Sequence, residues 1–214
     1  MNDPRQHNKN GPGLSRRQFL KGTGAAAAGT ALASVPLRAL AAPDDAAAGK
    51  PVAMGPAPVQ IELQVNGKKM NHAVEPRVTL LDCLRNHLDV TGCKRVCDRG
   101  TCGACTVMLD GKPVYSCTTL ALEAQGRDIK TAEALVDEGK LDAVPAAFVK
   151  NDAQQCGFCT PGFVVAMRAA FNKNADAKPA EIEEALSGKI CRCGTYQQMR
   201  DAIAELCKNQ GKGA

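Results

Sequence analysis

Hydrophobic and polar residues alternate at the start of the folded part of the chain. Between Val59 and Val65, aliphatic residues take every second position, and glutamine or glutamate takes the positions between them. A period of two predicts a half-buried strand. Asn66-Gly67 follows, a dipeptide typical of a type I′ turn, and Lys69–Val74 can return as a second strand. The pattern therefore predicts a β-hairpin.

The next segment has the spacing of a helix. The leucines between Leu80 and Leu88 fall on one helical face, and Thr79 is placed to cap the first turn. Further along, Asp110-Gly111 predicts a second hairpin, and residues 127–132 (RDIKTA) predict a last short strand. Together these segments predict a small mixed sheet that grasps a helix.

After Glu133 the pattern becomes helical. Thr160-Pro161 is typical of a helix start, with Thr160 as the N-cap and proline at the first helical position. Helices are expected at Asp142–Asn151, Pro161–Asn172, Ala180–Leu186 and Tyr196–Asn209. The predicted fold class is therefore α+β, with a mixed domain over residues 59–132 and an all-α domain over residues 133–210.

The first 41 residues have the pattern of an export signal. The stretch SRRQFLKG (Ser15–Gly22) precedes a weakly apolar run, and Ala39-Leu40-Ala41 supplies the small residues of a cleavage site. Arg16-Arg17 resembles the twin-arginine signal. A membrane anchor or a surface helix is the alternative, but the run is shorter and richer in Ala and Gly than the ~20 apolar residues of a spanning helix. We therefore expect residues 1–41 to be a twin-arginine signal peptide.

Export by this route implies a periplasmic protein that meets the membrane only during export. The pathway carries folded proteins, which suits a chain that receives a metal cofactor in the cytoplasm. Residues 42–58 are rich in Pro, Gly, Ala and Asp and show no periodicity. They are expected to form a flexible linker.

The positive charge of the chain is confined to the leader. The whole sequence has 27 Lys and Arg against 22 Asp and Glu, but basic and acidic side chains balance in residues 42–214. The mature chain therefore lacks the basic face that a phosphate backbone requires. No nucleic-acid partner is expected.

Cysteine carries the candidate chemistry, since the chain has 11 cysteines gathered in clusters. Clustering favours metal binding over a disulfide framework. The first cysteine set has the spacing C-x4-C-x2-C with a distant fourth cysteine, which is that of a plant-type 2Fe–2S site. Gly100 and Gly103 would let backbone amides turn toward such a cluster. The first cysteine set consists of Cys97, Cys102, Cys105 and Cys117.

Zinc and disulfides are the alternatives for the first cysteine set. Zinc prefers pairs of C-x2-C or mixed Cys and His ligands, and only one such pair is present there. The residues therefore favour a 2Fe–2S cluster over a zinc ion or two disulfides.

The second cysteine set has the spacing C-x2-C followed by a distant C-x-C, which suits either a 2Fe–2S cluster or zinc. Both pairs directly precede predicted helices, whose N-terminal dipoles favour a negatively charged cluster. The residues alone favour 2Fe–2S and leave zinc open. The second cysteine set consists of Cys156, Cys159, Cys191 and Cys193.

Three cysteines, Cys83, Cys93 and Cys207, remain outside the two sets. Free cysteine behaves as a small hydrophobe, so these are expected to be packing residues, and at most one disulfide could form among them. The sequence has no G-x-G-x-x-G loop, P-loop or G-x-S-x-G elbow. We therefore expect the chain to carry electrons and to have no catalytic residue of its own.

Three motifs, CDRGTCGACTVMLDG, QQCGFCTPGF and CRCGTY, occur in this order. Together they resemble the iron–sulfur subunit of the molybdenum hydroxylases, the xanthine dehydrogenase and aldehyde oxidoreductase family, over residues 60–208. The resemblance implies 2Fe–2S clusters in both cysteine sets, the first in a β-grasp ferredoxin-like domain and the second in a four-helix bundle. The leader and the CRCGTY form look most like bacterial periplasmic aldehyde or isoquinoline-type oxidoreductases. Cys93 departs from the family, which usually has a residue such as threonine there.

The resemblance also implies partners. In the family, the helical-domain cluster lies next to a molybdopterin on a large subunit, and motif match assigns the pterin contacts to Gln155 and Cys193. The molybdopterin is expected as the cytosine dinucleotide, and the other cluster passes electrons to FAD or to the haem of a cytochrome subunit. The chain would then be the electron-transfer subunit of an aldehyde or N-heterocycle oxidoreductase. The alternatives are a freestanding two-cluster ferredoxin that shuttles between enzymes and a zinc-stapled structural protein.

Overall fold

The computed structural model describes residues 55–210. The predicted signal peptide, residues 1–41, lies outside the described residues, and so does the predicted linker up to residue 54. Residues 55–58 are exposed and precede the first strand. The described residues all belong to one compact unit.

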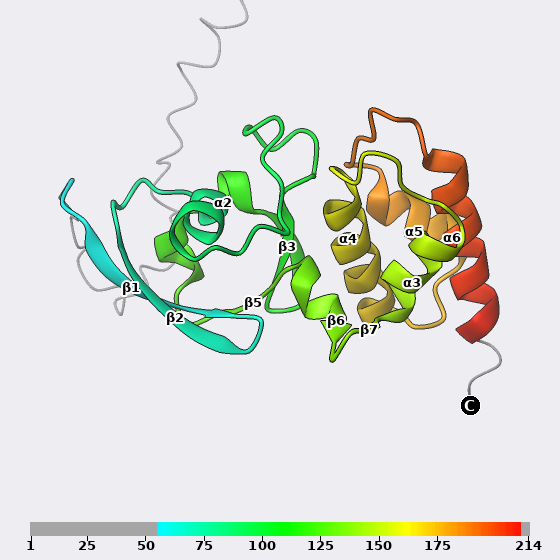
Figure 1. Cartoon of the computed structure of the whole chain (residues 1–214), viewed down its shortest axis with the longest axis horizontal. Coiled ribbons are helices and arrows are strands. Elements are labelled where there is room, and N and C mark those ends of the chain that lie inside the picture. The colour runs from blue at the N-terminus through cyan, green and yellow to red at the C-terminus, as the bar shows by residue number, and fades with distance from the viewer. Residues whose placement is uncertain (1–54, 211–214) are drawn as a thin grey trace, which may run out of the picture. The chain divides into compact units, whose positions relative to one another are not determined.

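Within the described residues, a five-stranded mixed sheet forms the N-terminal domain (Figure 1). The strand order is β2-β1-β5-β3-β4, in which β1 and β5 are parallel and all other neighbours are antiparallel. Parallel neighbours require a crossover, and this crossover contains helix α2 and the loop of the first cysteine set. The strands are β1 (Val59–Val65), β2 (Lys68–Val74), β3 (Thr106–Leu109), β4 (Lys112–Tyr115) and β5 (Asp128–Lys130).

The alternating pattern of β1 explains its place in the sheet. Ile61, Leu63 and Val65 are buried, whereas the polar residues between them are exposed. The turn to β2 has φ values of 50° at Asn66 and 77° at Gly67, the left-handed conformation that this dipeptide adopts readily. The predicted hairpin is therefore confirmed.

The helix that the sheet grasps is short. Helix α2 (Leu80–Asp82) begins at Thr79, whose Oγ1 accepts a hydrogen bond of 3.1 Å from the Asp82 N–H. It continues as a single π-helical segment, Cys83–His87. Its buried leucines share one core with the inward side chains of β1. The predicted cap and apolar face are confirmed.

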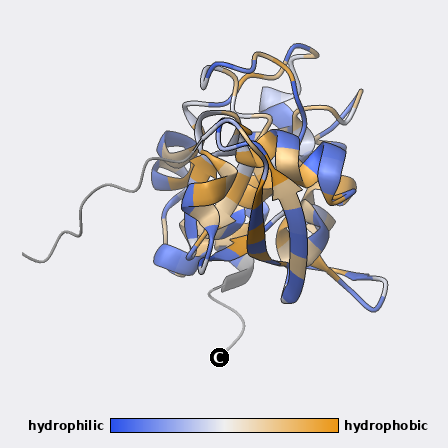
Figure 2. Ribbon diagram, turned by 90° about the vertical axis from the view of Figure 1, so that its left-hand side faces the viewer, coloured by the Kyte–Doolittle hydropathy of each residue, from blue (hydrophilic) through white to orange (hydrophobic). Residues whose placement is uncertain are grey.

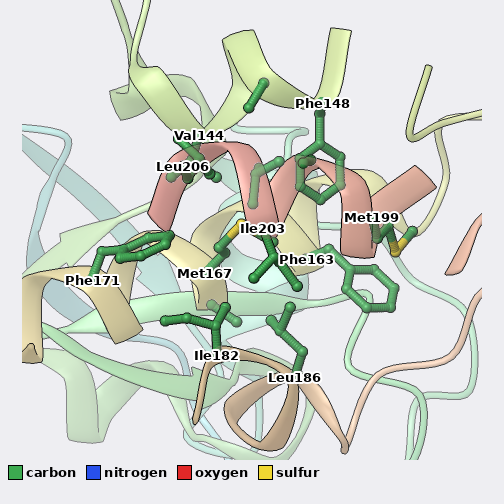
Figure 3. Close-up of a cluster of buried hydrophobic side chains, with 14 of the residues drawn as sticks. Val144, Phe148, Phe163, Met167, Phe171, Ile182, Leu186, Met199, Ile203 and Leu206 are labelled. Carbon is green, nitrogen blue, oxygen red and sulfur yellow. The ribbon is translucent and has the colours of Figure 1, made fainter. Parts of the chain in front are cut away.

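Four helices form the C-terminal domain in the part of the chain that the structure describes (Figure 1). Helices α3 and α5 each pack against both α4 and α6. Figure 3 shows the core between the helices, where Phe148, Met167 and Ile203 are fully buried. The helices are α3 (Ala143–Lys150), α4 (Thr160–Lys173), α5 (Pro179–Leu186) and α6 (Tyr196–Gln210).

Short elements connect the longer ones. A hairpin of two-residue strands, β6 (Val136–Asp137) and β7 (Lys140–Leu141), lies between the sheet and the first helix of the bundle. The hydrophobic pattern does not predict this hairpin, because two residues are too few to show a period. The 3₁₀ turns are Ser116–Thr118, Ala121–Ala124 and Ala132–Leu135.

Helix α4 begins one residue earlier than the sequence predicts. Cys159 already has helical backbone dihedrals (φ −84°, ψ −21°) and is the N-cap, so Thr160 is the first helical residue. The predicted N-cap role of Thr160 is wrong, since its Oγ1 is buried and has no hydrogen-bond partner among the described residues. Pro161 lies in the first turn, as expected.

Strand β3 is shared by two hydrophobic cores. Val107 and Leu109 belong to the core of the sheet and α2, whereas Met108 belongs to the core of the helices. Helix α4 packs directly against this strand. Figure 2 shows hydrophobic segments gathered at the centre and hydrophilic segments toward the loops and hairpin tips. The two domains therefore meet across a common strand.

The predicted α+β fold class is confirmed by this arrangement. The predicted boundary between residues 132 and 133 stays a prediction. Among the described residues, no helix combines the length and the apolar character that crossing a membrane requires.

Candidate metal centres

A loop and a hairpin bring the first cysteine set together. The loop before β3 carries three of its cysteines, and the turn after β4 carries the fourth, Cys117. Thr106, which follows Cys105, pairs with Tyr115 across the hairpin, so the end of β4 returns to the loop. Cys97 is half-buried, and the other three cysteines are buried.

Backbone amides of this loop point at cysteine sulfurs. The N–H groups of Thr101 and Cys102 donate to the Cys97 sulfur at 3.3 and 3.4 Å. The Gly100 N–H donates to the Cys117 sulfur at 3.3 Å. Gly100 has a φ of 71°, which L side chains rarely adopt and which turns its amide toward the sulfur. The loop is thus a nest of donors for a negatively charged group.

These hydrogen bonds stabilise a thiolate. A hydrogen bond from the backbone N–H of Arg99, together with those from other amides of the loop, lowers the pKa of Cys97. Burial raises this pKa by less, so the result is a pKa of about 6. Burial has the larger effect at Cys117 and raises its pKa to about 11. A metal-bound thiol is deprotonated outright. Cys97 is therefore the thiol whose loop already favours the form that a metal would bind.

The causes of the pKa shifts group the four thiols into two pairs. A hydrogen bond with the Cys102 thiol is among the causes that lower the pKa of Cys97, and one with the Cys105 thiol is among those that raise the pKa of Cys117. In a 2Fe–2S cluster with four cysteine ligands, each of the two irons takes two thiolates. The pairing therefore suits one iron at each pair.

The second cysteine set joins the loop before α4 to the loop between α5 and α6. A hydrogen bond with the Cys193 thiol is among the causes that lower the pKa of Cys156, and one with the Cys191 thiol is among those that raise the pKa of Cys159. The first of these pairs is exposed, whereas Cys159 is half-buried and Cys191 is buried. One pair therefore faces solvent and the other faces the protein.

The start of α6 holds Cys191. Burial raises the pKa of this thiol, but hydrogen bonds from Thr195 and other neighbours outweigh burial and lower the pKa to about 7. The Thr195 Oγ1 lies 3.3 Å from the Cys191 sulfur, and the Cys191 N–H donates to the Tyr196 hydroxyl at 2.7 Å. Burial raises the pKa of the neighbouring Cys159 to about 12. The pair thus combines one readily ionised thiol with one that needs the metal to ionise.

Each set has the four cysteines that a 2Fe–2S cluster takes as ligands. Among the described residues, no three His, Cys, Asp or Glu side chains form a group suited to one metal ion. A tetrahedral zinc site needs every sulfur about 2.3 Å from one point, whereas two separate pairs can bind two neighbouring irons. All 11 cysteines lie in the described residues and are free.

The loops of the two sets are in direct contact. Ile190, which precedes Cys191, donates its backbone N–H to the Cys102 carbonyl oxygen at 3.0 Å. The Tyr115 hydroxyl donates to the Gly188 carbonyl oxygen at 3.0 Å. Burial, and then the charges of all four thiols of the first set, raise the pKa of Tyr115. The loop that carries Cys191 therefore rests on the first cysteine set.

Glycines permit this close approach. A Cβ on Gly188 would lie 2.5 Å from the Tyr115 hydroxyl, and one on Gly103 would lie 2.6 Å from Cγ of Lys189. Lys189 is buried, with its ammonium 5.5 Å from the centroid of the Tyr115 ring. Burial lowers the pKa of Lys189, and the charge of Cys105 opposes that effect. Gly103 therefore makes room for a buried lysine beside the first set.

The other residues singled out from the sequence lie apart from these contacts. Gln155 is exposed beside Cys156. Burial raises the pKa of Cys83 to about 11 and that of Cys93 to about 12. The Cys207 thiol donates to the Ala177 carbonyl oxygen at 3.3 Å. Cys83, Cys93 and Cys207 therefore pack within the fold and belong to neither cysteine set.

Sequence reasoning misses Lys189 and Tyr115. Lysine is almost always exposed, so its position in the chain gives no sign of burial. Tyr115 ends a predicted strand and meets Gly188 only through the tertiary fold. The one available signal is the placement of Lys189 two residues before Cys191.

Comparison with known proteins matches family models to both domains and to the leader. A 2Fe-2S iron-sulfur cluster binding domain matches residues 63–135, and a 2Fe-2S binding domain matches residues 131–204. A twin-arginine translocation pathway signal sequence matches residues 13–33. The prediction of twin-arginine export to the periplasm is confirmed.

Several characterised proteins are similar over most of their length. The nicotine 6-hydroxylase small subunit of Paenarthrobacter nicotinovorans is 44% identical over 147 residues, which cover 69% of this chain and 88% of the relative. The aldehyde oxidoreductase iron-sulfur-binding subunit PaoA of Escherichia coli K12 is 38% identical over 215 residues, covering 94% of this chain and 91% of the relative.

Solved structures share the fold. A chain of quinoline 2-oxidoreductase from Pseudomonas putida 86 superposes with a TM-score of 0.69 at 38% identity, covering 73% of this chain and 98% of that chain. The aldehyde oxidoreductase of Desulfovibrio gigas superposes with a TM-score of 0.67 at 35% identity, covering 72% of this chain and 18% of that chain. The chain therefore belongs to the 2Fe–2S small subunits of the molybdenum hydroxylase family and carries a twin-arginine signal.

Proposed function

We propose that this subunit relays electrons from a molybdopterin on a large partner subunit to a flavin or haem on a second partner. The second cysteine set holds the cluster that receives the electrons, and the first cysteine set holds the cluster that passes them on. Family membership already makes the chain an iron–sulfur electron-transfer subunit of molybdenum hydroxylase complexes. The contacts around the two sets support the order of transfer.

The second cysteine set is placed to receive electrons from another protein. Cys156 and Cys193 are exposed, as is Gln155 beside them. Phe158 and Ile190 flank this surface and are each 50% exposed. Exposed apolar side chains that gather on one face mark a site of protein contact. We infer that the molybdopterin subunit covers this face, with Gln155 and Cys193 against the pterin.

The single observation that carries the proposed route between the two sets is the hydrogen bond from the Ile190 N–H to the Cys102 carbonyl oxygen, at 3.0 Å. Ile190 is bonded to Cys191 of the second set, and Cys102 belongs to the first. One hydrogen bond thus links the backbones that carry the two sets. A 2Fe–2S cluster takes up and releases one electron at a time, so the two electrons of a substrate oxidation would pass this contact in succession.

One cysteine of the first set lies near the surface. Cys97 is half-buried, and Val96 beside it is 56% exposed. The other three thiols of the set are buried. Electrons would therefore leave near Cys97, toward the flavin or haem of the second partner.

The names of the relatives suggest two substrate classes for the large subunit, aldehydes and N-heterocycles. Similarity to PaoA covers 94% of this chain, so it extends into the leader, whereas similarity to the nicotine 6-hydroxylase subunit covers 69%. PaoA is an aldehyde oxidoreductase subunit by name, and the other relative is a nicotine hydroxylase subunit. We therefore propose an aldehyde or an N-heterocycle as the substrate oxidised on the large subunit.

Co-purification from the native host tests the proposal. The chain is tagged at its C-terminus, isolated from the periplasm without oxygen, and analysed for iron, molybdenum and bound subunits. We expect molybdenum and a large subunit to accompany an iron-loaded chain. A lone brown protein without molybdenum would support the freestanding ferredoxin, and a colourless zinc protein would support a structural role; either contradicts the proposal.

A further inference from the structure

Lys189 is a buried cation without a carboxylate partner. Its side chain is 8% exposed. Within the described residues, the ion pairs that form involve other lysines and arginines, and none includes Lys189. Removing an ammonium group from water is costly unless an opposite charge accompanies it. A negative group of another kind beside Lys189 would offset this cost.

The side chain of Lys189 lies against the first cysteine set. Its stem crosses the loop at Gly103, the residue after Cys102, where a Cβ would meet the lysine Cγ at 2.6 Å. Its ammonium lies 5.5 Å from the centroid of the Tyr115 ring. Tyr115 in turn precedes Cys117 by two residues. Two cysteine-bearing segments thus frame the ammonium, which fits a site built for a cation beside a negatively charged group.

Other basic side chains near the two sets do not have this position. Arg99 lies on the loop of the first cysteine set and Arg192 lies between two cysteines of the second, but both are exposed. Water and salt screen exposed charges strongly, whereas a buried charge acts over several ångströms with much less screening. Of these three cations, Lys189 is therefore the one with the largest expected influence on the first cysteine set.

We propose that Lys189 is the counter-cation of the cluster in the first cysteine set and raises the reduction potential of that cluster. The inference rests on the proposed function, since it requires a 2Fe–2S cluster at these cysteines. A cluster held by four thiolates is doubly negative when oxidised and triply negative when it has gained one electron. A neighbouring ammonium stabilises the reduced form more than the oxidised form, and no proton needs to move.

The position of Lys189 in the chain gives this charge a further consequence. The same segment carries Cys191 of the second cysteine set, two residues further on, and the Ile190 N–H that meets Cys102. The helical domain, which would pass electrons to the first cysteine set, therefore also supplies the positive charge of Lys189 beside that set. Lys189 is a positioning residue for electron flow and does not ligate iron.

Redox titration of the purified, iron-loaded protein tests this role. Lys189→Met removes the charge at similar length, and Lys189→Arg retains it. Lys112→Met is the matched control, because it removes an exposed charge from β4, the strand that precedes Cys117. The reduced fraction of each cluster is followed by electron paramagnetic resonance at a series of fixed potentials, with dithionite as reductant.

We expect Lys189→Met to lower the ratio of reduced to oxidised cluster in the first cysteine set about tenfold at a given potential, equivalent to about 59 mV for a one-electron couple. Lys189→Arg and Lys112→Met should change this ratio much less, and the potential of the other cluster should move less than that of the first. Two clusters in the wild-type protein with an unchanged ratio in Lys189→Met would overturn the inference and leave the proposed function intact. A wild-type protein without two clusters would overturn both.

A loading defect in Lys189→Met is also informative. Lys189→Gln then serves as a second neutral variant. If both neutral variants lose the signal of the first cysteine set while Lys189→Arg keeps it, the charge is needed to hold the cluster, which supports the inference. If Lys189→Arg loses the signal as well, the lysine acts by packing, and the inference fails.

Discussion

Gly162, in the first turn of α4, lies against the carbonyl oxygen of Gly103, so closely that a Cβ on Gly162 would overlap that oxygen. Gly103 stands between two cysteines of the first set, and Gly162 follows Cys159 of the second set by three residues. The backbones of the two cysteine-bearing segments therefore touch with no side chain between them. Contact between the sets depends on this glycine as much as on hydrogen bonds.

Gly162→Ala should separate the two segments. Alanine favours a helix over glycine by about 1 kcal/mol, but a methyl group forced onto backbone costs about 1–3 kcal/mol. We expect a net loss of stability and slower electron transfer between the clusters. Urea unfolding and stopped-flow reduction would measure the two effects. Gly67→Ala is the control: its φ of 77° makes alanine unfavourable, but nothing lies within 4 Å, so electron transfer should be unchanged.

Cys193→Ser and Cys207→Ser should differ sharply in iron content. Cys193 belongs to the second cysteine set, so its loss should reduce the iron content from about four to about two per chain and lower stability, because bound metal contributes folding free energy. A serine at position 207 can still donate to the Ala177 carbonyl oxygen that Cys207 contacts. Equal iron content in the two variants would refute the ligand assignment.

Phe158→Asp should prevent docking of the molybdopterin subunit. The side chain is half exposed beside the second cysteine set, and a charge in an apolar contact cannot be matched there. We expect both clusters to load normally while the large subunit no longer co-purifies. Val136→Asp is the control, since Val136 is similarly exposed, at 46%, but lies on β6. Retention of the large subunit by Phe158→Asp would place the docking surface elsewhere.

Glu205 should contribute stability that disappears in acid. It links α6 to the end of α3, and hydrogen bonds first from Lys150 and then from Asn151 lower the pKa of its carboxyl below the ordinary value of 4.5. A lowered pKa in the folded state means that the stability is present above pH 4.5 and is lost as pH falls below that value. Glu205→Gln should therefore melt at a lower temperature than wild type at pH 7, and this difference should shrink below pH 4.5. A difference that is constant with pH would show that the carboxylate charge contributes nothing.

The regular elements could be predicted because their signals are local. Alternation in β1, the cap at Thr79 and the turn at Asp110-Gly111 each depend on residues close together in the chain. Helix α4 differs by one residue because Cys159 already has helical dihedrals and takes the N-cap position. The β6–β7 hairpin could have been suspected only from its turn, Glu138-Gly139, where both residues have positive φ.

The cysteine spacing similarly predicts which cysteines form each set. It does not predict which residues of the two sets are in contact. Contact between Ile190 and Cys102 joins residues far apart in sequence, and it depends on α4 packing against β3. Burial of Lys189 depends on the same packing. Such features follow from tertiary contacts that no short stretch of sequence encodes.

Iron quantification with electron paramagnetic resonance on the anaerobically purified, dithionite-reduced protein tests the central claim most directly. Two occupied cysteine sets should give about four irons per chain and two distinct 2Fe–2S signals. A fully loaded protein with about two irons, or with one kind of signal, would contradict the assignment of a cluster to each set.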